Sequence, residues 1–430
     1  MDYIYLYLAV IGLIIGLYMM RRRRIHAAHA NELHEAVAAG LNEPPSLHPV
    51  IDNARCIGSG ACVKACPEDA LGIVKGKAVL KNAAACIGHG ACLAACPVEA
   101  INLVFGTEKR GIDIPNVTPL FESNVPGIFI AGELGGMGLI RKAPEQGRQA
   151  MDTIKSRKGG GNTDYDVVIV GCGPAGLSAG LAAMEHKLRY KLIEQEDSLG
   201  GAVYHYPRQK IAMTAPVRLA LVGMVKFGEV QKEKLLEFWQ GVVGKTGLQI
   251  AFRERMEEIE NKDGVFVVKT SQGRYTAGNV LLTMGRRGTP RKLEVPGEET
   301  PKVVYRLIEP AQYEGQAVLV VGGGDSALEA AIALSEQQGT DVTLSYRSAA
   351  FSRVKQKNRL LLEQQQQAGR LRVLLNSKVR QIHEAEVEIE HDDGVHRYRN
   401  DAVIVCAGGL LPTPLLQKVG IQFETKYGTA

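Results

Sequence analysis

Two cysteine-rich runs of the same design follow one another near the start of the chain. The first contains Cys56, Cys62 and Cys66, and the second contains Cys86, Cys92 and Cys96. Each run ends in proline, and Ser59 and His89 occupy the same position within their runs. Because six of the eight cysteines lie in this repeat, we expect a fold that gathers thiols around metal, not a disulfide framework, in a reducing compartment.

Both runs match the bacterial ferredoxin frame C-x2-C-x2-C-x3-C-P, with the second cysteine replaced by Ser59 or His89. In two-cluster ferredoxins the fourth cysteine of each run serves the other cluster. The resemblance implies one site of Cys56, Cys62, Cys96 and Ser59, and a second site of Cys86, Cys92, Cys66 and His89.

Three outcomes stay open for these sites. Serine and histidine ligate and complete two [4Fe–4S] clusters, or a corner stays empty and leaves a three-iron cluster or an open iron. The third outcome is that the cysteines hold zinc or no metal. We expect two iron–sulfur clusters of the 4Fe-4S type, with a noncysteinyl ligand at one or both sites.

The amino terminus predicts a membrane anchor. Tyr3 to Met20 is almost wholly apolar and Arg21 to Arg24 follow it, which predicts a single span with the catalytic domains in the cytoplasm. The alternative is an apolar helix covered by a partner. The arginine cluster accounts for most of the net charge of +5, so no broad basic face indicates nucleic acid.

A dinucleotide fingerprint follows the glycine-rich stretch at 159–161. Asp166 to Val170 predicts a buried parallel strand, and a glycine loop, a helix to about His186 and a second strand ending in Glu194 come next. The loop residues are Gly171, Gly173, Pro174, Ala175 and Gly176. Such a loop admits a pyrophosphate at a helix amino terminus, and the acid binds ribose hydroxyls.

The same pattern recurs after the strand at 317–321. Its loop and first helical turn supply Gly322, Gly324, Asp325, Ser326 and Ala327. No acid follows the next strand, whereas Arg347 and Arg353 lie just beyond it. Arginines there suit a 2′-phosphate, so we expect NADPH ahead of NADH, the alternative being arginines that only solubilise a loop.

From Asp164 to about Phe423 the chain resembles the thioredoxin-reductase-like two-domain flavoproteins. The matching motifs are Thr283-Met284-Gly285 at the domain crossing, Cys406 to Gly409 at the return crossing, and the pair Gly200 and Gly201 near the flavin. The resemblance implies FAD in the first nucleotide site and NAD(P)H in the second.

Two departures from that family carry information. The stretch Val303 to Pro310, where thioredoxin reductase has its CxxC, contains no cysteine, so the chain looks like the ferredoxin–NAD(P)H reductases among the relatives. The closing Ala-Gly-Asp segment is missing from the end, and a similar one, with Gly132 and Glu133, lies upstream. We interpret this as a circular permutation of the FAD domain, or as a segment exchanged in a homodimer.

The predicted fold is an α/β flavoprotein with Rossmann-like FAD and NAD(P) domains, a small α+β ferredoxin-like domain and one amino-terminal transmembrane helix. The predicted units are an anchor with its basic flank (1–24), a spacer (25–50), an iron–sulfur domain (51–106), the permuted FAD-domain segment (112–158), a glycine-rich linker (159–163), the FAD-binding domain (164–288), the NAD(P)H-binding domain (289–405) and the return segment of the FAD domain (406–430).

The predicted function is electron transfer between NAD(P)H, FAD, the clusters and a one-electron partner such as ferredoxin, a quinone or a cytochrome. No side chain is assigned as a catalytic acid or base, because the cofactors carry the chemistry. The alternatives are a flavoenzyme that reduces an organic or sulfur substrate directly and a redox-sensing subunit without turnover.

Overall fold

The structure is a computed structural model of the whole chain. It describes residues 2–38, 44, 47–86, 88, 90–108, 111–136, 139–157, 162–206, 211–214, 216–286, 289–351, 354–391, 394–410 and 412–428. His89, Arg353 and residues 159–161 of the predicted linker lie outside this part of the chain.

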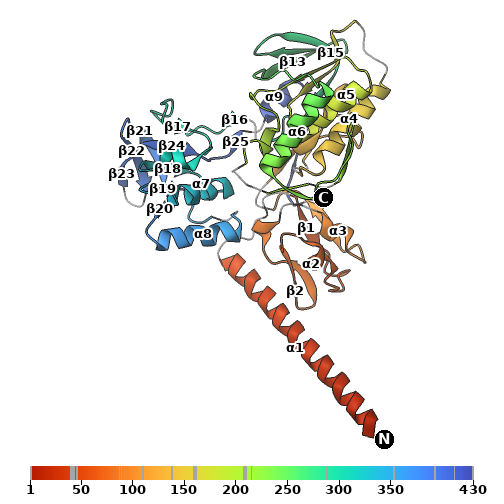
Figure 1. The fold of residues 1–430 in the computed structure, drawn as a ribbon, viewed down its shortest axis with the longest axis vertical. Helices are drawn as coiled ribbons and strands as arrows, with labels where there is room; N and C mark the ends of the chain where they lie inside the picture. The colour runs from red at the N-terminus through yellow and green to blue at the C-terminus, as the bar shows by residue number, and fades with distance from the viewer. Residues whose placement is uncertain are drawn as a thin grey trace.

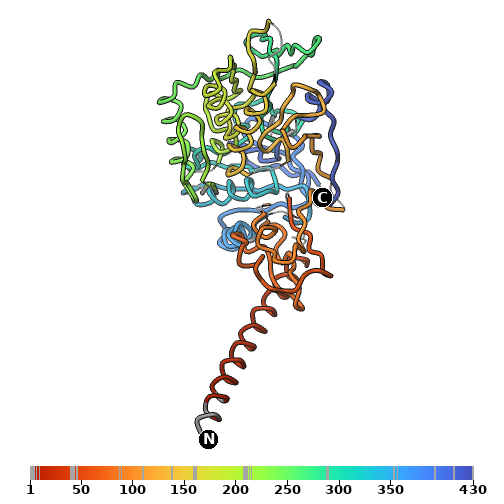
Figure 2. Tube along the Cα trace, turned by 90° about the vertical axis from the view of Figure 1, so that its right-hand side faces the viewer, coloured from red at the N-terminus to blue at the C-terminus, as the bar shows by residue number. Residues whose placement is uncertain are grey.

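A single helix, α1 (Asp2–Ala38), projects from the rest of the molecule (Figures 1 and 2). It does not end at the arginine cluster but continues through residues 25–38, which the sequence assigned to a spacer. Its last part docks on the cysteine-containing domain, where the backbone N–H of Ile73 donates to Nδ1 of His29 (3.0 Å). The docked part is therefore an element of that domain.

The prediction of a membrane anchor requires correction. Among the residues that the structure describes, no helix is long and apolar enough to cross a membrane. The predicted single-pass anchor, and the membrane localisation built on it, are wrong.

The cysteine-containing domain repeats a small α+β unit. Strand β1 pairs with β4 and β2 pairs with β3, both antiparallel. Each cysteine run contains one short helix. The elements are β1 (His48–Ile51), α2 (Ala61–Ala65), β2 (Leu71–Val74), β3 (Lys77–Leu80), η1 (Ala83–Ala85), α3 (Ala91–Ala94) and β4 (Ile101–Val104). The predicted ferredoxin-like architecture is confirmed.

The first nucleotide-binding domain is built on a mixed sheet in the order β13-β14-β15-β7-β8. Strand β6, from the segment before the linker, adds to β15 in parallel, and α4 packs against α5 within the same chain. The elements are β6 (Ile128–Ile130), η2 (Gly132–Gly135), α4 (Ala143–Ser156), β7 (Tyr165–Val170), α5 (Pro174–Glu185), β8 (Tyr190–Ile193), η3 (Gly201–Val203), β9 (Ile211–Met213), β10 (Val217–Leu219), β11 (Gly223–Val225), β12 (Glu229–Gln231), α6 (Lys232–Thr246), β13 (Met256–Lys262), β14 (Val265–Thr270) and β15 (Arg274–Leu282).

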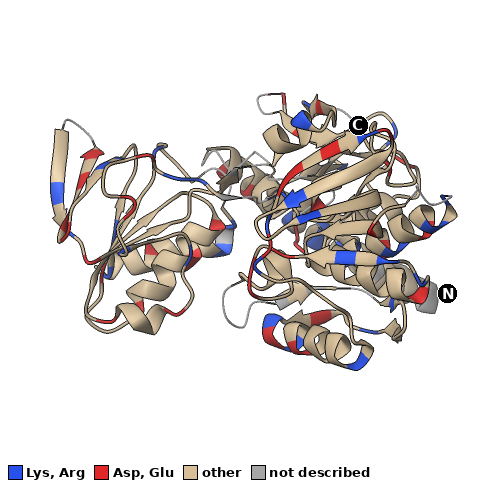
Figure 3. Cartoon of the chain, turned by 90° about the horizontal axis from the view of Figure 1, so that it is seen from above, with Lys and Arg blue, Asp and Glu red and all other residues tan. Residues whose placement is uncertain are grey.

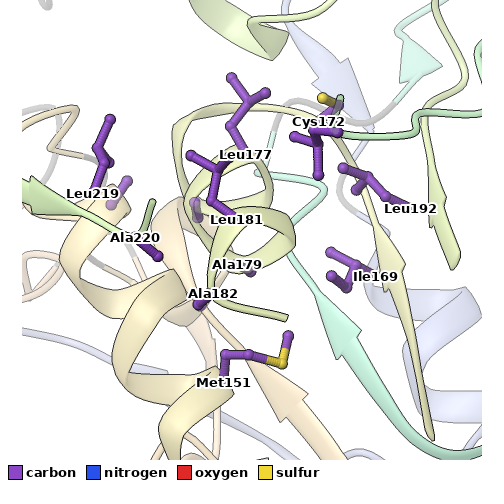
Figure 4. Packing of buried hydrophobic residues seen from close by; sticks show 14 of the residues in the cluster. Met151, Ile169, Cys172, Leu177, Ala179, Leu181, Ala182, Leu192, Leu219 and Ala220 are labelled. Atoms are coloured by element: carbon purple, nitrogen blue, oxygen red, sulfur yellow. The ribbon is translucent and has the colours of Figure 1, made fainter. Parts of the chain in front are cut away.

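The core of this domain forms because its central strand is apolar on both faces. Val167, Val168 and Ile169 are completely buried, as expected for a parallel strand covered on both sides. Figure 4 shows Cys172 in this core between Leu177 and Leu192. The first glycine loop therefore follows directly from a strand that is buried in the core.

The second nucleotide-binding domain repeats the plan on a smaller parallel sheet, β17-β24-β18-β19-β20, next to an antiparallel sheet β21-β22-β23. Its elements are β17 (Val303–Val304), η4 (Pro310–Tyr313), β18 (Ala317–Val321), α7 (Asp325–Ser335), β19 (Asp341–Ser345), α8 (Gln356–Gln367), β20 (Leu371–Leu374), β21 (Lys378–Ile382), β22 (Glu386–His391), β23 (Gly394–Arg399) and β24 (Ala402–Val405). Two dinucleotide-binding domains are thus confirmed.

The chain passes between the two domains twice, at β16 (Thr289–Pro290) and β25 (Gly409–Leu410), which pair with each other. It then returns through α9 (Thr413–Lys418) and β26 (Phe423–Lys426), and β26 pairs with β5 (Ile112–Pro115). Figure 3 shows the two bodies side by side, with acidic and basic residues interspersed on each.

Candidate functional site

One cleft of about 1990 Å³ lies between the two nucleotide-binding domains, and both glycine loops line it. Gly171 and Gly173 line it from the first domain, and Gly322 and Gly324 from the second. Two nucleotides bound at these loops would therefore share one cleft.

The first loop requires glycine at two positions because the chain packs there directly against backbone. Gly171 has a φ of 101°, and a Cβ there would lie 2.9 Å from the carbonyl oxygen of Thr283. A Cβ on Gly176 would lie 1.9 Å from the carbonyl oxygen of Gly171, so only glycine lets α5 start this close to β7. Pro174 and Ala175 of the first turn of α5 also line the cleft.

Glu194 lines the same cleft at the carboxyl end of β8 and is buried. Its Oε2 accepts a hydrogen bond from the backbone N–H of Cys172 (2.7 Å), and Oε1 accepts one from the N–H of Glu196 (3.1 Å). Burial raises the pKa of Glu194 despite these hydrogen bonds. The predicted ribose ligand therefore also ties the glycine loop to β8.

Five further predicted positions, from three segments of the chain, lie on the FAD side. Gly201 lines the cleft, and the N–H of Gly200 donates to the carbonyl oxygen of Cys172 (2.9 Å). Gly132 and Glu133, from the segment before the linker, line it too, and a Cβ on Gly285 would lie 3.6 Å from Oε2 of Glu133. The structure thus brings residues from three separate segments to one wall.

Arg286 follows Gly285 next to this wall, and the sequence reasoning missed it. Its Nη2 donates to the carbonyl oxygen of Asp113 (2.8 Å), and burial lowers the pKa of its guanidinium, against the opposing charge of Glu133. The only local signal was a cation directly after the crossing turn. Its partner Asp113 lies 173 residues earlier, which no local pattern reveals.

The second loop shows the same close packing. Gly322 has a φ of 149°, and a Cβ there would lie 2.4 Å from the carbonyl oxygen of Cys406. Ser326 lines the cleft and Ala327 is buried behind it. The Oδ1 of Asp325 accepts from the N–H of Lys355 (2.9 Å) and from Nδ2 of Asn358 (2.8 Å), so this predicted site residue anchors the start of α8.

A polar cluster joins the two domains across the cleft. Arg306 of the second domain contacts the ring of His205 of the first through a hydrogen bond, and Nε2 of His205 lies 3.8 Å from Oε1 of Glu196. All three residues line the cleft. Arg306 belongs to the stretch Val303 to Pro310, where thioredoxin reductase has its cysteine pair and this chain has no cysteine.

The first predicted iron–sulfur site forms a small pocket. Cys56, Ser59, Cys62 and Cys96 all line it. Ser59 is exposed, and its Oγ accepts from the N–H of Ala61 (3.4 Å). Three thiols and a hydroxyl thus converge as the ferredoxin frame implies.

In the second predicted site, Cys66 lies close enough for its charge to act on both Cys86 and Cys92, and the charge of Cys92 acts on Cys86. Burial raises the pKa of Cys86 to about 11 and also raises that of Cys92. A buried thiol with a raised pKa would lose its proton only when a cation stabilises the thiolate. Cluster iron would supply that stabilisation. Within the described residues, no three His, Cys, Asp or Glu side chains form a single-ion site.

Residues 168–429 match the pyridine nucleotide-disulphide oxidoreductases, and residues 48–97 match the 4Fe-4S dicluster domain. A ferredoxin–NADP reductase of Thermus thermophilus is 29% identical over 272 residues, 60% of this chain and 77% of the reductase. A bacilliredoxin reductase of Bacillus subtilis is 26% identical over 267 residues, 61% of this chain and 82% of that protein.

Among solved structures, a bacillithiol disulfide reductase from Bacillus cereus superposes with a TM-score of 0.53 at 25% identity. The superposition covers 60% of this chain and 82% of that protein. Because the family match spans more than half of the chain, this protein belongs to the pyridine nucleotide-disulphide oxidoreductase family, as an FAD-dependent NAD(P)H oxidoreductase joined to a 4Fe-4S dicluster domain.

Proposed function

We propose that the protein transfers electrons between NAD(P)H and a one-electron partner through FAD and two iron–sulfur clusters. The observation that carries the proposal is the single cleft lined by both glycine loops, in a chain that also carries the cysteine repeat. A flavin suits this role because it exchanges two electrons with a nicotinamide and single electrons with a cluster.

The residues of the first domain fit FAD. The loop from Gly171 to Gly176 leaves space for a pyrophosphate at the amino terminus of α5, where the helix dipole favours negative charge. Glu194 would bind ribose hydroxyls, and Glu133 would lie toward the ribityl chain. Since β6 and α4 complete this domain, we interpret the segment 112–158 as its permuted closing piece.

The residues of the second domain fit a nicotinamide nucleotide. Gly322 to Gly324 precede α7 as Gly171 to Gly173 precede α5, so a second pyrophosphate has an equivalent site. The cation Arg347 lines the cleft, and the acid that NADH would require is absent there. We therefore propose NADPH as the preferred nucleotide.

The cysteine domain would hold the clusters in two sets. Cys56, Cys62 and Cys96 with Ser59 would bind one, and Cys66, Cys86 and Cys92 would bind the other together with His89. The partner is a ferredoxin, another one-electron protein or a quinone. This class of partner is supported by the similarity to ferredoxin–NADP reductases.

A second candidate is direct reduction of a small disulfide or organic substrate at the flavin. Its support is the likeness to bacilliredoxin and bacillithiol disulfide reductases. Turnover of such a substrate without any electron-transfer protein would favour it.

Anaerobic titration with NADPH and then NADH tests the proposal, with optical and EPR spectra recorded together. Flavin bleaching accompanied by signals of reduced clusters is the expected result. If neither nucleotide bleaches the flavin, the reductase function is refuted. If iron analysis finds no iron in anaerobically purified protein, the transfer through clusters is refuted.

A further inference from the structure

The carboxyl end of β19 carries no acid that could bind a ribose 2′-hydroxyl. NAD-preferring folds place an acid directly after this strand, as Glu194 follows β8, whereas this chain has Tyr346 after Ser345, the last residue of β19. Ser345 is 1% exposed, and its Oγ lies 2.7 Å from Oγ of Ser377, which is 2% exposed. The hydroxyl of Ser345 is therefore used inside the protein.

Ser377 ties the start of β21 to this end of β19. Its Oγ donates to the carbonyl oxygen of Leu374 (2.7 Å) and accepts from the N–H of Tyr346 (3.1 Å), and its own N–H donates to the carbonyl oxygen of Tyr346 (3.0 Å). With both serine hydroxyls occupied, the two strand ends are held together.

The residues that follow these two ties are both cations. Arg347 follows Tyr346 and Lys378 follows Ser377, and both are exposed residues that line the cleft with Gly322 to Gly324. The neighbouring Arg380 is different, because it forms an ion pair with Glu390. Lys378 is thus placed at the loop by the same contacts that place Arg347.

The carboxylates at this end of the cleft are used elsewhere. Asp325 accepts two hydrogen bonds from the start of α8, and Oε1 of Glu329 lies 3.2 Å from Nδ2 of Asn358. The ring of Tyr346 stacks on Phe351 and covers Gly323, where a Cβ would lie 2.1 Å from the ring. The environment is therefore cationic and sterically defined.

We propose that Lys378, held beside Arg347 by the buried Ser345–Ser377 pair, is a specificity-determining residue that binds the 2′-phosphate of NADPH. The inference rests on the proposed binding of a nicotinamide nucleotide by this domain. The ammonium group of Lys378 would attract the negative charge of a 2′-phosphate, whereas the 2′-hydroxyl of NADH carries no charge. Lys378 would therefore favour NADPH over NADH.

The test is calorimetric titration of the flavin-loaded full-length protein with 2′,5′-ADP and with 5′-AMP, which differ in the 2′-phosphate. Lys378→Met is expected to weaken binding of 2′,5′-ADP about tenfold and to leave that of 5′-AMP unchanged. Lys378→Arg is expected to retain most of the affinity. In turnover, Lys378→Met should raise the KM for NADPH with little change in kcat.

Lys292→Met is the matched control, because Lys292 lines the same cleft but acts electrostatically on Glu298. Unchanged affinity of Lys378→Met for 2′,5′-ADP would overturn the proposal, as would an equal loss for both probes, which would mean a structural role. If the unmodified protein bound neither probe, the nucleotide-binding function of the domain would fall as well.

Discussion

The thiols outside the ferredoxin-like domain show how burial decides the chemistry of a single residue. Burial raises the pKa of Cys172, with a further increase from the charge of Glu194, and raises that of Cys406 to about 12. Because the thiolate is the reactive form, we expect iodoacetamide at pH 8 to modify both at least ~100-fold more slowly than a free thiol.

Mass spectrometry of alkylated peptides measures this difference. In guanidinium with an iron chelator, all eight cysteines should react, which controls for peptide recovery. Fast modification of Cys172 in the folded protein would contradict its placement in the core. It would instead indicate a reactive thiol close to the flavin site.

At the scale of elements, α4 and α5 approach so closely that one position tolerates only glycine. A Cβ on Gly147 of α4 would lie 2.1 Å from the carbonyl oxygen of Ala175, which belongs to the first turn of α5. Gly147→Ala should lower the free energy of unfolding by about 2–3 kcal/mol and loosen the flavin, since α5 carries the glycine loop.

The control is Gly241→Ala in α6, where the added Cβ would meet no described atom within 4 Å apart from the glycine, its chain neighbours and the nearby backbone of its own helix. Alanine favours a helix over glycine, so this variant should be unchanged or more stable by ~0.5–1 kcal/mol. Urea unfolding and flavin release measure both variants. Equal stability of the two would mean that the segment 143–156 does not complete the FAD domain.

The docking of α1 is a second property of elements. The side chain of Lys81 is 4% exposed, and its Nζ lies 2.8 Å from both Oε2 of Glu32 and Oδ2 of Asp69. Burial alone would lower the pKa of Lys81, but the hydrogen bonds to Asp69 and Glu32 outweigh it and raise the pKa. Lys81→Met should therefore weaken docking by about 1–3 kcal/mol.

Hydrogen exchange of residues 25–38 measures this loss, because an undocked helix exchanges faster. Lys64→Met is the control, since Lys64 is an exposed residue of α2 in the same domain. Unchanged exchange in Lys81→Met would show that the contact of His29 with Ile73 holds the helix without the ion pairs.

For the whole molecule, the cluster of Glu196, His205 and Arg306 links the two nucleotide-binding domains. The side chain of Arg306 is 44% exposed, so solvent screens its charge and we expect at most ~1 kcal/mol from the link. Arg306→Ala should change the observed rate of flavin reduction by NADPH no more than about fivefold, through the relative placement of the domains.

Stopped-flow reduction measures the rate, and small-angle scattering reports the domain separation. Arg253→Ala is the control, because Arg253 lines the cleft but lies near Asp197 of its own domain, at 3.8 Å. A rate loss in Arg306→Ala far beyond fivefold with unchanged scattering would indicate direct contact with the nucleotide instead.

The sequence could predict the parts of the fold and site that depend on neighbours along the chain. Gly171 and Gly322 were identified because a phosphate loop between a strand and a helix requires glycine at fixed spacing. The cysteine repeat likewise encodes its fold in local spacing. The apolar run before Arg21 led to the wrong prediction of a membrane anchor. Hydropathy alone did not show that the helix continues to Ala38 and docks on β2.

Contacts between distant segments were not predictable in this way. Arg286 meets Asp113, Arg306 meets His205, and Lys378 is placed by Ser345, each across a long stretch of chain. Local spacing and composition therefore establish two nucleotide folds and a cysteine repeat, since backbone geometry at each loop is set by adjacent residues. Which charges share a cleft depends on packing between domains, and that packing exists only in the folded chain.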